Sequence, residues 1–169
     1  MKLKFYEEKL ESSDVFKEFK KENPKAYLCS AFIVVDKEGK NNKIHLDYFI
    51  PEKKEMVSFH LSDEISKVPL ETYDDKIPEK VLLNGSLSLG EIEEIIENKM
   101  KVENLTNKIQ KIILSLQKIN GEDILAGTVF ITMLGMIKIK INAKNKNVVD
   151  FEKKSLMDIM NVLKRKDKI

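Results

Sequence analysis

The chain has 169 residues, of which 42% are hydrophobic and 34% charged, so it can bury a core and is not disordered by composition. Thirty basic and 28 acidic residues leave a net charge of +2, which gives no general case for nucleic acid as a partner. The one cysteine, Cys29, excludes an intrachain disulfide and a four-thiolate zinc site. The first residues form no apolar run, and no apolar stretch reaches the about 20 residues that span a bilayer. We therefore expect a cytoplasmic protein without a transmembrane segment.

The N-terminal segment has the apolar spacing of a helix. Leu3, Tyr6 and Leu10 fall on one face, and a Ser-Ser-Asp run at 12–14 offers an N-cap for a second apolar stripe. The stripe ends at Asn23-Pro24, because proline disfavours helical geometry in the residue before it.

Three β-prone runs follow, at Ala26–Asp36, Lys43–Ile50 and Met56–Leu61, and short turns join them into an antiparallel meander. An even loop between the last two runs pairs position 44 with 61 and position 45 with 60. One face of that hairpin is then almost wholly apolar, as a one-sided sheet requires. It carries Ile44, Leu46, Tyr48, Ile50, Val57, Phe59 and Leu61.

Residues 62–87 are expected to connect two halves of the chain, with one short element at Lys80–Leu83. Ser88-Leu89-Gly90-Glu91 has capping-box spacing and opens a helix. A further helical stripe is predicted from Leu105 to Ile119, ending at Asn120-Gly121. Whether 88–119 is one helix or two stays open, with 101–104 as the expected break.

The C-terminal part predicts strands at Asp123–Met133, Met136–Ala143 and Val148–Phe151, and then a helix capped by Ser155. The apolar face of this helix carries Leu156, Ile159, Met160 and Leu163. We expect it to pack on the sheet, with Met133, Met136, Met157 and Met160 filling the core. The alternatives are that these methionines line an adaptable surface, or that the basic end Lys164-Arg165-Lys166 rests on an acidic membrane or partner.

The order helix, strand, strand, strand thus occurs twice, which predicts an internal repeat. The predicted fold class is α+β, with two helix-on-antiparallel-sheet repeats in one compact chain and a C-terminal helix. Residues 1–87 form the first repeat with its connecting segment, and residues 88–169 form the second repeat with the last helix.

The second repeat resembles a known family. Its segment Ile139-Lys140-Ile141-Asn142-Ala143-Lys144-Asn145-Lys146-Asn147-Val148-Val149 is similar to the closing hairpin of PepSY-type domains, although Asn142 stands where the family commonly has Asp. The resemblance covers residues 90–152, with a degenerate copy over 10–62. It implies a cystatin-like helix across a curved antiparallel sheet, a role in binding or restraining partners, and no catalytic residues.

The two histidines of the chain suggest a metal site. The predicted register places His45 and His60 opposite each other on adjacent strands, with Asp47 two residues along on the same face. Directly opposed side chains have Cβ atoms about 5 Å apart, which suits two ligands of one ion. The alternative is that these polar residues merely occupy a solvated sheet face.

We therefore expect a non-enzymatic binding or scaffold protein that holds a protein or peptide on a sheet face. The alternatives are a peptidase inhibitor or regulator, and a small-molecule or metal-binding protein. A second copy of the chain is a further candidate partner, and no cofactor is expected. Cys29 lies in an apolar strand and is expected to be a buried, inert thiol. Neither Ser30 nor Ser58 lies in the Gly-x-Ser-x-Gly context of a hydrolase.

Overall fold

A computed structural model describes residues 1–72, 75–83 and 87–167 of the chain, apart from the side chain of Ile159. In this part of the chain, two groups of helices and strands follow each other. The first comprises α1 (Leu3–Glu11), α2 (Asp14–Glu22), β1 (Tyr27–Asp36), β2 (Lys43–Ile50), β3 (Glu55–Leu61) and β4 (Ile65–Leu70). The second comprises α3 (Leu89–Val102), β5 (Ile109–Ile119), β6 (Glu122–Ile131), β7 (Gly135–Asn142), β8 (Val148–Ser155) and α4 (Leu156–Lys166).

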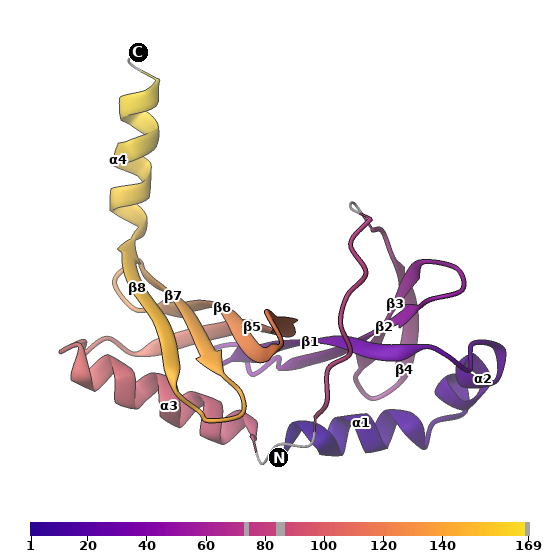
Figure 1. Cartoon of the computed structure of the whole chain (residues 1–169). Helices are drawn as coiled ribbons and strands as arrows, with labels where there is room; N and C mark the ends of the chain where they lie inside the picture. The colour runs from indigo at the N-terminus through magenta and orange to yellow at the C-terminus, as the bar shows by residue number, and fades with distance from the viewer. Residues whose placement is uncertain (73–74, 84–86, 168–169) are drawn as a thin grey trace.

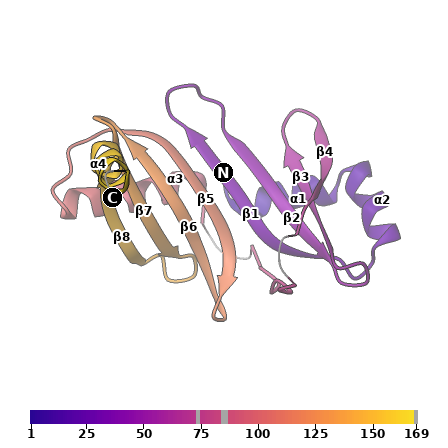
Figure 2. The same ribbon diagram turned by 90° about the horizontal axis from the view of Figure 1, so that it is seen from above.

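The strands form one eight-stranded antiparallel sheet in the order β4-β3-β2-β1-β5-β6-β7-β8 (Figure 2). Each group contributes a meander in which neighbours in sequence are neighbours in the sheet. The two meanders join where β1 pairs with β5, for example at Ile33 opposite Leu114. The fold class is therefore α+β, as the sequence predicts.

The core lies between the sheet and helices α1, α2 and α3, which all lie on the same face of the sheet (Figure 1). Alternation along the strands selects the residues that face these helices. Phe16 and Phe19 of α2 pack on the aromatic rings of Tyr48 and Phe59, with ring centroids 5.0–6.1 Å apart. The central strands and α3 bury Ala31, Ile33, Val35, Ile112, Leu114, Leu116, Ile92, Ile96 and Met100.

Several local predictions are confirmed. The β2–β3 hairpin has the expected register, with Ile44 opposite Leu61 and His45 opposite His60. The Ser13 hydroxyl accepts a hydrogen bond from the amide of Phe16 at the start of α2. Ser88 and Glu91 form the capping box at the start of α3, because each side chain accepts from the other's backbone N–H.

The helix predicted over Leu105–Ile119 is wrong, because this segment forms strand β5. Its apolar residues satisfy both a helical and an alternating pattern, and burial of Ile112, Leu114 and Leu116 shows that alternation prevails. Asn120 and Gly121 are not a helix end. Both have positive φ, 51° and 78°, as the tight turn between β5 and β6 requires.

The prediction for residues 62–87 is also wrong in detail. The strand in this segment is β4, and Lys80–Leu83 is not a strand. Pro69 lies in β4, where an edge strand tolerates the missing N–H. Val81 and Leu83 are nevertheless buried, and the amide of Val81 donates to the carbonyl of Leu28 at 2.9 Å. Four strands therefore follow the helices of each half, where the sequence predicted three.

Helix α4 differs most from expectation. Ser155 caps it as predicted, and its hydroxyl accepts from the amide of Met157. However, α4 rises away from the sheet instead of packing on it (Figure 1). Met157, Met160 and Leu163 are exposed rather than part of the core, and Ile159 lies outside the described side chains. Among the described helices, none has the length and apolar character needed to cross a membrane.

We predict that Gly127→Ala destabilises the protein by at least about 2 kcal/mol, because the sheet leaves no space for a methyl group there. A Cβ at Gly127 would lie 2.0 Å from the backbone oxygen of Ile113. Gly90→Ala in α3 is the matched control, since its Cβ would meet only the Ser88 hydroxyl at 3.8 Å. The control should stabilise by about 0.5 kcal/mol. Urea denaturation measures the free energy of unfolding of both variants. Equal denaturation midpoints for the two variants would contradict the described packing.

Candidate functional site

The side of the sheet opposite α1, α2 and α3 is called the open face here. Its central part is apolar. Val34 of β1 lies opposite Ile113 of β5, and Phe130 of β6 lies opposite Met136 of β7. Val34 is buried and the other three are half-buried. Their sequence neighbours point to the helix side, so this apolar surface is additional to the core.

His45 and His60 lie on the open face, on β2 and β3. Their rings are stacked, with centroids 3.6 Å apart and planes 10° from parallel. The ring of Phe32 on β1 continues the row, with its centroid 5.4 Å from that of His45. The structure thus brings the two histidines together as the sequence predicts, and adds an aromatic neighbour that the prediction lacked.

Asp47, the third predicted ligand, lies two residues from His45 on β2. Its carboxylate accepts a hydrogen bond of 2.5 Å from the Ser30 hydroxyl across the β1–β2 pair. Among the described residues, no three His, Cys, Asp or Glu side chains are placed to hold a metal ion together. A metal bound by the histidine pair therefore stays a prediction.

The environment of His45 favours its neutral form. Burial lowers the pKa of His45, the nearby His60 and Lys43 lower it further, and only the Asp47 carboxylate opposes this shift. Two stacked imidazoles could not both carry a proton without repulsion. The observed stack therefore suits a pair in which His45 is neutral.

Cys29 is buried, as expected for an inert thiol. Burial, and to a smaller extent the Asp47 carboxylate, raise the pKa of its thiol to about 12. The thiol donates to the backbone oxygen of Asp47 at 3.4 Å. A thiol held protonated in this way is neither a nucleophile nor a metal ligand.

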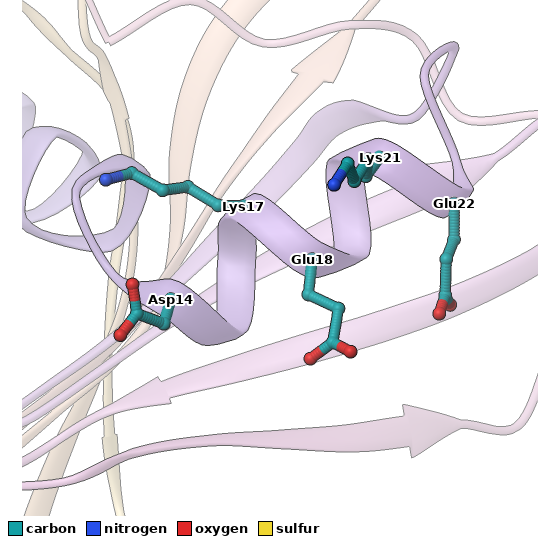
Figure 3. Close-up of a pocket in the computed structure, with 5 residues that line it drawn as sticks. All are labelled: Asp14, Lys17, Glu18, Lys21 and Glu22. Atoms are coloured by element: carbon teal, nitrogen blue, oxygen red, sulfur yellow. The ribbon is translucent and has the colours of Figure 1, made fainter.

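A shallow hollow lies on α2 and not at the histidines (Figure 3). Five charged side chains line it: Asp14, Lys17, Glu18, Lys21 and Glu22. The carboxylates follow one row of the helix and the lysines another, as i,i+4 spacing dictates (Figure 3). This is a solvated face of mixed charge that offers no convergent site.

The β6–β7 turn carries two exposed apolar residues, one of which, Met133, was predicted to lie in the preceding strand. Met133 and Leu134 have φ of 62° and 56°, and they are 88% and 58% exposed. The sequence feature that could have indicated this turn is Gly135, which ends an apolar run just before the next alternating strand. The strand predicted to reach Met133 instead ends at Ile131.

Comparison with known proteins identifies a fold and not a family. No protein-family model matches the chain, and no curated protein matches it in sequence. A crystal structure of a "putative lipoprotein" from Clostridium difficile 630 is similar, with a TM-score of 0.53 and 14% identity. The match covers 83% of this chain and 91% of that one. At this identity, the likeness concerns the fold alone.

We predict that the protein loses stability as the pH falls through about 6.5, because unfolded His45 accepts a proton more readily than folded His45. Stability from this residue is present above that pH and is lost below it. His45→Gln should therefore show a smaller decrease in melting temperature between about pH 7.5 and pH 5.5. Equal decreases for the two proteins would contradict the role of His45.

If the histidine pair binds zinc, the ion should raise the melting temperature of the wild type, because binding to the folded state alone stabilises it. His45→Ala combined with His60→Ala should abolish the rise. The stacked rings must turn for this, since imidazole lone pairs lie in the ring plane. Asp47→Asn is the control for a third ligand, and a rise unchanged in the double variant would exclude the site.

Proposed function

We propose that the protein is a non-enzymatic binding module that holds a protein or peptide on the open face. The observation that carries this proposal is the one-sided cover of the sheet: α1, α2 and α3 all lie on one face (Figure 1). The other face presents half-buried Phe32, Ile113, Phe130 and Met136. Apolar surface of this kind marks interaction sites.

The shape of this surface suits a polypeptide better than a small molecule. In the row that runs across the sheet from Phe32, the next residues are Ser115 and Ala126. These short side chains lie between the aromatic ring and Lys140 of β7. A broad sheet surface with a lowered centre can accept side chains of an extended segment or of a protein surface.

We further propose that the two halves are PepSY-like repeats of the cystatin-like kind. In support of this, helices precede an antiparallel meander in each half and pack against it. The two meanders meet at their first strands, β1 and β5. The resemblance of residues 139–149 to the family falls on β7, the following turn and β8. Partner binding is what this resemblance implies.

The test is a pull-down with the tagged protein from its native lysate, comparing Ser115→Lys with Asn98→Lys. Each variant adds one lysine, the first at the centre of the open face and the second at an exposed position of α3. We expect Ser115→Lys to reduce the recovered amount of each stoichiometric partner at least about ten-fold, because a buried unpaired charge opposes binding. Asn98→Lys should retain them. Equal recovery by both variants would place binding elsewhere.

A further inference from the structure

The β6–β7 turn presents apolar side chains in a strained conformation. Met133 and Leu134, together called the apolar tip, both have positive φ, which bulky residues adopt at a cost. Asn-Gly would occupy such a turn with less strain. Met133 is the most exposed large apolar residue described. Neither burial nor turn geometry explains these two residues, so a role in binding is the physical alternative.

The apolar tip is held rigidly by hydrogen bonds on both sides of the turn. The amide of Thr132 donates to the oxygen of Lys108 at 2.9 Å, and the Thr132 hydroxyl accepts from the amide of Lys108 at 3.0 Å. The Asn107 amide group donates to the oxygen of Thr132 at 2.9 Å. On the other side, the amide of Leu156 donates to the oxygen of Leu134 at 2.8 Å. These bonds hold the backbone of the tip in place, so binding costs little backbone entropy.

The last of these bonds connects the tip to the base of α4. This helix has an apolar side, formed by residues spaced one turn apart, and a polar side opposite. At about 100° per residue, Lys164 and Lys166 border the apolar side on its two edges, while Asp158 and Arg165 lie on the polar side. Of the exposed apolar residues, Met160 and Leu163 lie between the two lysines, and Met157 and Val162 lie just outside them. Each of the four is between 52% and 56% exposed.

We propose that the apolar tip and the apolar side of α4 together form a site for peripheral binding to an anionic lipid surface. Apolar side chains would enter the boundary between headgroups and acyl chains, and the bordering lysines would contact anionic headgroups. Exposed Lys108 adds positive charge beside the tip, because its backbone amide bonds to the Thr132 hydroxyl. Lys154 of β8 is already paired with Glu152 at 3.6 Å. The proposal does not depend on partner binding at the open face.

Two observations favour a lipid surface over a second copy of the chain. Self-association through this side of α4 would bring Lys164 and Lys166 of two copies to one seam, while Asp158 points to the opposite side and cannot compensate them. The apolar tip is also a convex protrusion at a hairpin end, with Met133 88% exposed. A protrusion is accommodated by a fluid surface without a matching groove.

The first test measures sedimentation of the full chain with phosphatidylcholine vesicles that contain about one-third phosphatidylglycerol, or none. We expect binding to the anionic vesicles that weakens with salt. Met133→Asn combined with Leu134→Gly should reduce binding at least about ten-fold, because two apolar anchors are lost. The same variant should melt at an equal or higher temperature, since Asn-Gly relieves the strain. If the turn had a purely structural role, the variant would melt at an equal or higher temperature but bind vesicles as the wild type does.

The second test changes charge. Lys164→Gln with Lys166→Gln should weaken binding to anionic vesicles by about five-fold per lysine at low salt. Lys17→Gln with Lys21→Gln is the matched control, because α2 lies at the other end of the sheet from α4 (Figure 2). The control should bind as the wild type does. Absence of binding to anionic vesicles, or equal loss in both charge variants, would overturn the proposal. A dimer in solution that the tip variant dissociates would also overturn it.

Discussion

The pairing of β1 with β5 is the interaction on which the rest of the structure depends. Seven residue pairs, from Ser30 opposite Gln117 to Asp36 opposite Lys111, join two meanders into one sheet. Without it, β1 and β5 would each be an edge strand that exposes a row of unpaired backbone N–H and C=O groups. On the helix side the same pairing places Ile33 beside Leu114, both fully buried. On the open face it places Val34 beside Ile113, so the apolar centre of that face exists only in the joined sheet.

This construction leaves the molecule covered on one side. The three helices that precede the two meanders all pack on the same face, and α4, which follows the last strand, rises from the other (Figure 1). Antiparallel sheets tolerate this, because one face can remain in contact with water. The exposed surface is then divided between the open face at the centre of the sheet and the tip with α4 at one end. The first is broad and the second protrudes, so they suit different partners.

A residue pattern that fits only one kind of secondary structure could be interpreted correctly from the sequence. A pattern that fits both helix and strand could not. The register of β2 with β3 followed from alternation, because a slip by one residue would turn Ile44 and Phe59 to the wrong face. This alone placed His45 opposite His60. In β5, adjacent Ile112, Ile113 and Leu114 fit a helix as well as a strand, and the decision came from pairing with β1, which lies far away in sequence. The strand β4 was missed because it is a half-exposed edge that contains Pro69. For α4, the apolar side was recognisable, but periodicity cannot say what covers it.

The apolar tip differs from the other segments in which residue type conflicts with local structure, because burial does not compensate the conflict there. Residue choices that conflict with local structure are ordinarily compensated by packing, as the helical pattern of β5 is compensated by burial of Ile112 and Leu116. Met133 and Leu134 have no such compensation, because their side chains remain exposed while their backbone adopts positive φ. The strain is sustained by the hydrogen bonds of Thr132 and Leu134, which would hold Asn-Gly equally well. The stability of the fold alone therefore does not require these side chains, and the reason for them is to be sought in what the turn contacts outside the chain.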